Sequence, residues 1–132
     1  MNISHIHSLF LKCKSISIDT RKIESESLFV AIKGENFDAN TFAKEALEKG
    51  ASYVVIDNPD YCIDQRTILV NDSLKTLQEL AQYHRNFLKL PIIALTGSNG
   101  KTTTKELIYV VLSSKYRTKA TVGNLNNHIG VP

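Results

Sequence analysis

The sequence predicts an α/β protein in two parts, a small complete domain followed by the start of a mainly parallel-sheet domain. Short apolar runs alternate with segments of helical periodicity between residues 3 and 88. Residues 89–91, Lys-Leu-Pro, interrupt this pattern. A new apolar run over 92–96 then passes through a glycine-rich turn into another helical segment. We therefore place one domain at 1–88 and the second at 89–132.

The first part has elements with clear local signals. Apolar residues recur every three or four positions where a helix is expected, and runs or alternations of apolar residues mark strands. Glycine is expected just past the end of a helix, as Gly50 is here. The predicted elements are a helix over 3–11, strands around 16–18 and over 28–32, a helix capped by Asn40 or Thr41 and ending near Lys49, strands over 51–56 and 67–70, and a helix from Asp72 or Ser73 to 88.

The second part is short. Residues 92–96 are predicted to form a buried strand and residues 117–122 another, with a helix between them. Leu107, Ile108, Val111 and Leu112 fall on one face of that helix. Two strands cannot cover a stable α/β core. We therefore expect the chain to be a fragment of a longer protein.

Composition and charge exclude several classes of protein. The net charge of +3 is small and scattered along the 132 residues, which argues against a nucleic-acid binder. We see no signal peptide and no apolar run long enough to span a bilayer, so we expect a cytoplasmic protein. Cys13 and Cys62 lack metal-ligand spacing and are expected to be reduced thiols. His5 and His7 point in different directions on a helix, so they do not predict a metal site.

The segment from Leu95 to Thr104 carries the strongest chemical signal. It reads Leu-Thr-Gly-Ser-Asn-Gly-Lys-Thr-Thr-Thr, between the predicted strand and helix. Glycines let backbone N–H groups at a helix N-terminus close around a polyphosphate. Lys101 would add charge at the outer phosphates, and the Thr102 hydroxyl could enter a Mg²⁺ shell. The first glycine of the common phosphate-loop pattern is replaced by Leu95, so that pattern is matched only in its second half.

Three further polar segments are weaker signals. Asp19-Thr20-Arg21 ends a predicted strand, where a hydroxyl and a guanidinium can bind phosphate or sugar. Residues 33–38 form a polar turn with one aromatic ring, and residues 123–132 form a loop rich in asparagine. Taken alone, the first two are more often solvated turns than binding segments, and the third is also consistent with a turn-rich connection.

Together these segments resemble the Mur ligase family. Ile18-Asp19-Thr20-Arg21, residues 28–34, Phe37-Asp38 and Phe42 resemble its N-terminal substrate domain, and 95–103 resembles its ATP loop, in which the first glycine is commonly absent. The segment from Gly123 to Pro132 is similar to the branch that joins D-alanyl-D-alanine to UDP-N-acetylmuramoyl-tripeptide. The resemblance runs from about residue 16 to the end.

The resemblance implies an ATP- and Mg²⁺-dependent ligase of peptidoglycan precursor synthesis that works through an acyl phosphate and is monomeric as a full-length enzyme. It assigns catalysis to Lys101 and the Mg²⁺ contact to Thr102. ATP would be bound by Gly97, Ser98, Asn99, Gly100, Lys101, Thr102 and Thr103. The UDP-muramyl substrate would be bound by Ile18, Thr20, Arg21, Glu35, Asn36, Phe37, Asn124, Asn126 and Asn127. The remaining catalytic groups and the D-alanyl-D-alanine site would lie beyond Pro132, so the chain alone is expected to be inactive.

The sequence departs from the family pattern at three places. Thr20 stands where serine is usual, Glu26 where glycine is frequent, and Ala39-Asn40 where Gly-His is often seen. Two alternatives remain open at this stage. One is the sister ligase that adds the third residue of the stem peptide. The other is a non-catalytic UDP-sugar-binding module with a vestigial phosphate loop.

Overall fold

The computed structural model describes residues 2–123, 127–129 and 131. It divides into two compact units, Met1–Leu88 and Lys89–Pro132. No helix in the described part of the chain is both long enough and apolar enough to cross a membrane.

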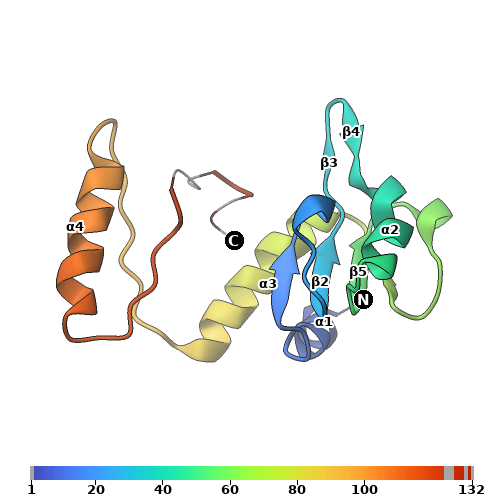
Figure 1. Ribbon diagram of the computed structural model, residues 1–132, viewed down its shortest axis with the longest axis horizontal. Coiled ribbons are helices and arrows are strands. Elements are labelled where there is room, and N and C mark those ends of the chain that lie inside the picture. The colour runs from blue at the N-terminus through green and yellow to red at the C-terminus, as the bar shows by residue number, and fades with distance from the viewer. Residues whose placement is uncertain (1, 124–126, 130, 132) are drawn as a thin grey trace. The chain divides into compact units, whose positions relative to one another are not determined.

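The first unit is built on a four-stranded parallel sheet (Figure 1). Its strands lie in the order β1 (Ser15–Ser17), β2 (Ser27–Val30), β5 (Tyr53–Ile56) and β6 (Thr67–Leu69), which is also their order in the chain. Because all four strands are parallel, their carboxyl ends lie at one edge of the sheet. The loops that follow the strands are therefore gathered at that edge.

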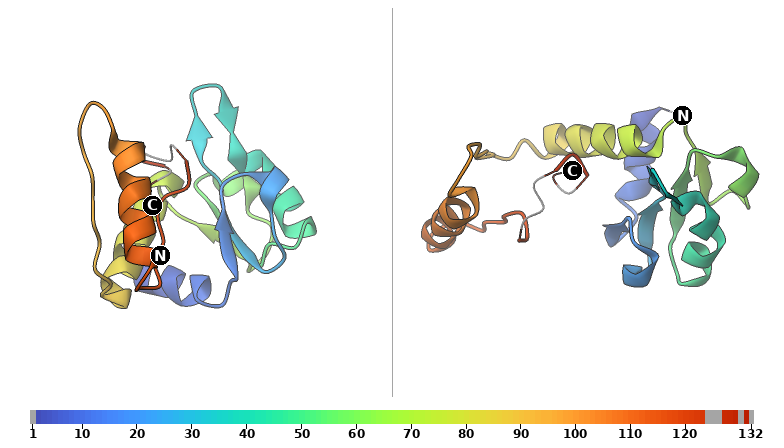
Figure 2. Two further views of the ribbon diagram at one scale, coloured as in Figure 1. Left: turned by 60° about the vertical axis from the view of Figure 1, so that its left-hand side comes forward. Right: turned by 90° about the horizontal axis from the view of Figure 1, so that it is seen from above.

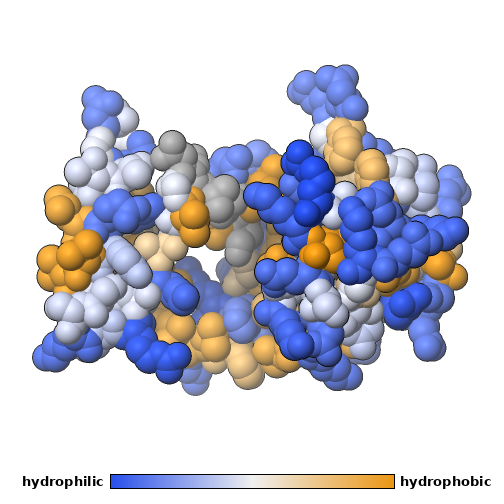
Figure 3. Space-filling view, viewed as in Figure 1, coloured by the Kyte–Doolittle hydropathy of each residue, from blue (hydrophilic) through white to orange (hydrophobic). Residues whose placement is uncertain are grey.

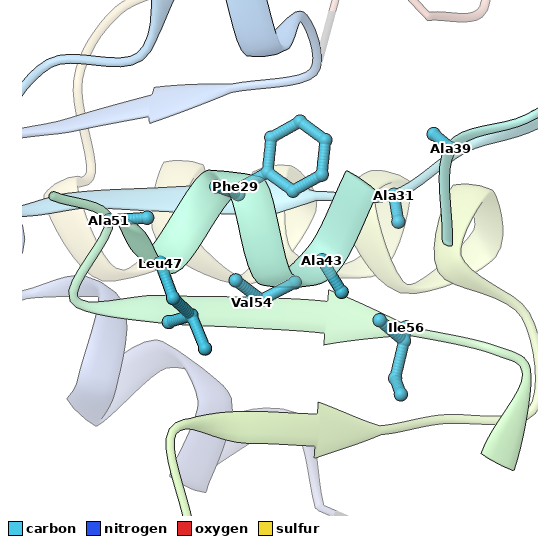
Figure 4. Close-up of a cluster of buried hydrophobic side chains, with 9 residues drawn as sticks. Phe29, Ala31, Ala39, Ala43, Leu47, Ala51, Val54 and Ile56 are labelled. Carbon is cyan, nitrogen blue, oxygen red and sulfur yellow. The ribbon is translucent and has the colours of Figure 1, made fainter. Parts of the chain in front are cut away.

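Helices cover both faces of this sheet. Alternate residues of β2 and β5 point to opposite faces, as the pleat requires. Phe29, Val54 and Ile56 pack with the short helix α2 (Ala43–Glu48), and Figure 4 shows these side chains in one cluster beside α2 and the strands. Leu28, Val30 and Val55 face α1 (Ile3–Phe10) and α3 (Ser73–Leu88). The result is a three-layer α/β/α unit, which confirms the predicted fold class.

The first residues of two helices can be compared with the starts that the sequence predicts. Asp72 Oδ1 accepts a hydrogen bond of 2.8 Å from the Lys75 amide, so the predicted start of α3 is confirmed. The predicted start of the preceding helix was wrong. A 3₁₀ turn, η2 (Ala39–Phe42), comes first, and Asp38 caps it by accepting from the Asn40 amide. Asp38 provides the cap because its carboxylate lies two residues before that amide.

A small antiparallel hairpin follows β2. It consists of β3 (Lys33–Gly34) and β4 (Phe37–Asp38), with Lys33 opposite Asp38. The hairpin projects beyond the carboxyl end of β2 (Figures 1 and 2). The polar turn found in the sequence is therefore the tip of a structured hairpin.

The second unit has one regular element among its described residues, helix α4 (Lys101–Ser113). The buried strands predicted at 92–96 and 117–122 were wrong: these residues form no strand. Ile92 and Ile93 are 59% and 62% exposed. A strand exists only when its backbone groups pair with a neighbour, and the described residues of this unit supply no such pairing.

Candidate functional site

The loop before α4 has the backbone that phosphate binding requires. Gly97 and Gly100 have φ angles of 143° and 77°, which side-chain-bearing residues rarely adopt. An added Cβ at either position would meet no atom within 4 Å, so the backbone angle, and not crowding, selects glycine. Gly100 is the N-cap of α4 and provides no side-chain acceptor. The first turn of a helix has amides without an acceptor inside the helix, and such amides can bind an anion.

Lys101 lies over this loop. Its ammonium donates to the carbonyl oxygens of Gly97 and Ser98, the latter at 3.5 Å. Ser98 and Asn99 are exposed beside it. Thr102 and Thr103, in the first turn of α4, are exposed as well. The structure thus gathers all seven predicted ATP-binding residues, 97–103, at one helix end.

Sequence analysis missed Lys105, one helical turn after Lys101. Its ammonium donates to the carbonyls of Thr121 at 2.6 Å and Gly123 at 3.1 Å, and it pairs with Glu106 at 2.9 Å. Its side chain is only 16% exposed. Lys105 therefore holds the returning segment against α4. Its spacing of four from Lys101, which puts both on one helix face, was the available signal.

The predicted asparagine contacts lie just after this anchored segment. Asn127 Oδ1 accepts from the Ile129 amide at 3.1 Å, so its side chain shapes the local turn. Asn124 and Asn126 lie outside the described residues. Their assignment as substrate contacts stays a prediction.

In the first unit, the predicted substrate residues follow two adjacent strands. Ile18, Thr20 and Arg21 come directly after β1, and Ile18 is 42% exposed. Glu35, Asn36 and Phe37 form the hairpin after β2, which pairs with β1 in parallel. Both groups therefore leave the same edge of the sheet, the usual place for a ligand in an open α/β sheet.

Arg21 is oriented by its neighbour Asp19. Its Nε and Nη2 atoms donate to the two carboxylate oxygens of Asp19 at 2.9 and 2.7 Å. These hydrogen bonds from the Arg21 side chain lower the pKa of Asp19 to about 2. The guanidinium side chain is still 85% exposed. It is therefore fixed in direction and accessible to a ligand.

The hairpin presents an aromatic surface. Phe37 is 57% exposed and stacks on Phe42, with ring centroids 5.5 Å apart and planes at 21°. Glu35 and Asn36 at the tip are exposed. A half-exposed ring supported from one side can receive a planar group.

Sequence analysis also missed a polar network at the base of the hairpin, which we call the Asp57 network: Lys33, Asp38, Asn40, Asp57 and Ser73. Asn40 is fully buried. Its Nδ2 donates to Asp38 Oδ1 at 2.6 Å and to Asp57 Oδ1 at 2.8 Å, while its Oδ1 accepts from the Asp57 amide at 3.0 Å. The Ser73 amide donates to Asp57 Oδ2 at 3.2 Å, and Lys33 pairs with Asp57 at 3.1 Å.

Asp57 is ionised within this network. Burial alone would raise its pKa, but the hydrogen bonds from Asn40, Ser73 and Lys33 together lower it below the ordinary value. The Ser73 amide belongs to the N-terminus of α3, where a negative charge is favoured. A negatively charged side chain of the protein itself, Asp57, therefore lies at this edge of the sheet.

The described residues hold no group of three or more His, Cys, Asp or Glu side chains arranged for a metal ion. The predicted Mg²⁺ contact, Thr102, is of another kind, since its single hydroxyl would share the ion with phosphate oxygens. A hydroxyl oxygen at the first turn of α4 has the chemistry that this role requires.

Known proteins match both units. The family described as "Mur ligase family, catalytic domain" matches residues 12–89, and "Mur ligase middle domain" matches residues 95–132. UDP-N-acetylmuramoyl-tripeptide–D-alanyl-D-alanine ligase of Bacillus subtilis is 45% identical over 119 residues, and that of Escherichia coli 43% over 118. Each alignment covers 89% of this chain and 26% of the relative.

Solved structures agree with these matches. MurF from Acinetobacter baumannii superposes with a TM-score of 0.80 at 35% identity, over 98% of this chain and 31% of that one. MurF from Thermotoga maritima, solved in complex with ADP, gives 0.79 at 32% identity, over 92% and 28%. The chain spans between a quarter and a third of the length of these relatives.

Proposed function

The chain belongs to the Mur ligase family, and from this premise we propose that it is the amino-terminal part of an ATP-dependent ligase that joins D-alanyl-D-alanine to UDP-N-acetylmuramoyl-tripeptide. The observation that carries the proposal is the loop at 97–100, with two left-handed glycines and Lys101 folded over them. It lies within the segment that matches the family's middle domain. Relatives at 43–45% identity bear the name of this reaction.

The loop supports the first half of that reaction. The γ-phosphoryl group of ATP would pass to the terminal carboxylate of the tripeptide, giving an acyl phosphate and ADP. Lys101 and the amides at the start of α4 would stabilise the charge on the transferring group. Thr102 would hold Mg²⁺, which neutralises charge on the β- and γ-phosphates. The amine of D-alanyl-D-alanine would then attack the acyl carbon, forming the peptide bond and releasing phosphate.

We assign the other end of the substrate to the first unit. Thr20 and Arg21 supply a hydroxyl and an oriented guanidinium for the diphosphate and sugar. Ile18 and Phe37 supply apolar surface, and Glu35 and Asn36 supply polar groups for the uridine. Asn124, Asn126 and Asn127 are assigned to the phosphates or the nucleotide.

We also propose an oligomeric state and a cellular compartment for the enzyme. Its substrates are soluble small molecules, and we place the monomeric full-length enzyme in the cytoplasm. The unpaired thiols of Cys13 and Cys62 support a reducing compartment. The chain covers less than a third of its solved relatives, so we expect no turnover from the 132 residues alone.

The test uses the full-length ligase and measures phosphate release that depends on both UDP-N-acetylmuramoyl-tripeptide and D-alanyl-D-alanine. Lys101→Ala should lower kcat by about 10²- to 10³-fold, because a charged donor to the transition state is lost. Lys115→Ala, an exposed lysine beside Tyr116, is the matched control and should behave as the parent does.

Three results would contradict the proposal. Full activity of Lys101→Ala would remove the loop from catalysis. Turnover of UDP-N-acetylmuramoyl-dipeptide with a diamino acid, and none of the tripeptide with D-alanyl-D-alanine, would identify the protein as the sister ligase. Binding of the UDP substrate without any binding of ATP would leave a non-catalytic module.

A further inference from the structure

The Asp57 network holds both ends of the β3–β4 hairpin. Lys33 opens β3, Asp38 closes β4, and the two residues are opposite each other in the ladder. Lys33 contacts Asp57 directly, and Asp38 reaches it through the amide of Asn40. Asp57 follows β5, and its other carboxylate oxygen accepts from Ser73 at the start of α3. The base of the hairpin is therefore tied to two further segments of the same sheet edge.

Burial makes this attachment rigid. The Asn40 side chain is fully excluded from solvent, and the Asp57 side chain is 12% exposed. Hydrogen bonds to carboxylates are short and strong, and a buried charge that loses its partner is costly. The tip of the hairpin, by contrast, is exposed at Glu35 and Asn36. The network thus fixes the base of an element whose outer residues are free to meet a ligand.

We propose that Asp57 and Asn40, together with Lys33, are positioning residues that hold the hairpin in the orientation needed to bind the UDP end of the substrate. The inference rests on the proposed function, because it takes residues 35–37 as substrate contacts. A hairpin held in place before binding loses less conformational freedom when the ligand arrives. The network should therefore affect affinity for the UDP substrate, and leave ATP binding and the chemical step unchanged.

Lys33 allows a test that preserves the fold, since its side chain is 45% exposed. In the full-length ligase, Lys33→Met keeps the aliphatic stem and removes the ammonium. KM for UDP-N-acetylmuramoyl-tripeptide should rise about tenfold, while kcat and KM for ATP stay within about twofold. Lys33→Arg retains the cation and should restore KM to within about twofold. Lys44→Met, which removes an exposed pair with Glu48 on α2, is the control and should change nothing.

A second variant tests the buried part of the network. Asp57→Asn keeps the shape of the side chain and removes the charge that Ser73 and Lys33 contact. It should weaken binding of the UDP substrate, measured by calorimetric titration, by at least tenfold. Circular dichroism checks its folding. If Asp57→Asn does not fold, the comparison of Lys33→Met with Lys33→Arg tests the positioning role.

The outcomes separate this inference from the proposed function. A parent enzyme that does not bind UDP-N-acetylmuramoyl-tripeptide would overturn both. A parent that binds it, with Lys33→Met showing an unchanged KM or an equal rise in KM for ATP, would overturn the positioning role alone. Failure of Lys33→Arg to restore KM would also overturn it, because the cation would then not be the group that matters.

Discussion

The two units differ in the solvent exposure of their apolar side chains. In the first unit, Phe29, Val54 and Val55 are completely excluded from solvent. In the second, no described residue is buried, and Leu107, Val110 and Val111 of α4 are 64–69% exposed. Figure 3 shows hydrophobic side chains at the surface over α4, at the left of the view. The same kind of amphipathic helix is thus covered in one unit and open in the other.

The difference shows what each unit needs in order to be stable. The first unit has all three layers within residues 3–88, so both faces of its sheet are covered by helices. In the second, Ile93 and α4 line an open apolar groove of about 370 Å³, formed with Leu107, Ile108, Val111 and Leu112. A parallel sheet normally covers such a helix face. The loop at 97–100 is formed by local geometry, whereas the apolar face of the helix that follows it is not covered by any packing among the described residues.

Core substitutions should separate the two units most strongly. Phe29→Ala should cost about 3–5 kcal/mol of unfolding free energy, because it opens a cavity in a closed core. Val111→Ala should change stability by less than about 0.5 kcal/mol in the 132-residue chain, because the side chain is already 69% exposed. Urea denaturation, followed through the NMR amide signals of each unit, measures both. Equal costs would mean that α4 is as well packed as the sheet.

The same contrast explains how far the sequence could predict the structure. The strands and most helices of the first unit were predicted because their periodicity agrees with partners present in the chain. The strands at 92–96 and 117–122 were wrong because a strand depends on a neighbour that sequence pattern alone cannot supply. The turn that leads into α4 was predictable because it is local, determined by two glycines and the start of one helix. Its role in binding phosphate stays a prediction.

The Asp57 network was beyond prediction for a different reason. Asn40 and Asp57 are 17 residues apart, and no periodic pattern links them. They meet only because the hairpin and β5 leave the same edge of the sheet. The departure from the family pattern at Asn40 was visible in the sequence, but the buried position that makes it important was not.

The stability of the first unit should depend on pH through one buried histidine. His7 on α1 is 4% exposed, and its Nε2 shares a hydrogen bond of 3.0 Å with Nδ1 of His84 on α3. Burial lowers the pKa of His7, and the neighbouring His84 lowers it further. Since the folded-state pKa is depressed, this contribution to stability is present above the ordinary pKa of 6.5 and is lost as the pH falls below it.

The measurement is the urea midpoint of the first unit between pH 7.5 and pH 5.5. The midpoint of the parent should fall with acidification, and the free energy of unfolding derived from it should change by no more than about 1.4 kcal/mol per pH unit for one proton. His7→Phe should flatten this slope. His5→Gln, at an exposed position on the same helix, should retain it. A slope that survives in His7→Phe would place the sensitive group elsewhere.

The smallest effect concerns one backbone conformation that both units contain. Glu26 has φ of 64° in the first unit, and Gly100 has φ of 77° in the second. A side chain in this left-handed region costs about 1–2 kcal/mol. The first unit accommodates that cost at Glu26 through backbone hydrogen bonds of 2.8 Å to Lys14 and Gly50 and an ion pair with Lys14. The second unit has glycine, which avoids it.

Glu26→Gly, the residue frequent in the family at this place, should therefore stabilise the first unit by about 0.5 kcal/mol. The strain that it removes exceeds the added entropy of glycine in the unfolded chain, about 0.5–1 kcal/mol, and the small contribution of an exposed ion pair. Glu26→Ala keeps the strain and loses only the ion pair, so it should be slightly destabilising. Urea denaturation compares the two variants. If Glu26→Gly were no more stable than Glu26→Ala, the strain at this position would be negligible, and the closed core would accommodate a left-handed side chain without measurable cost.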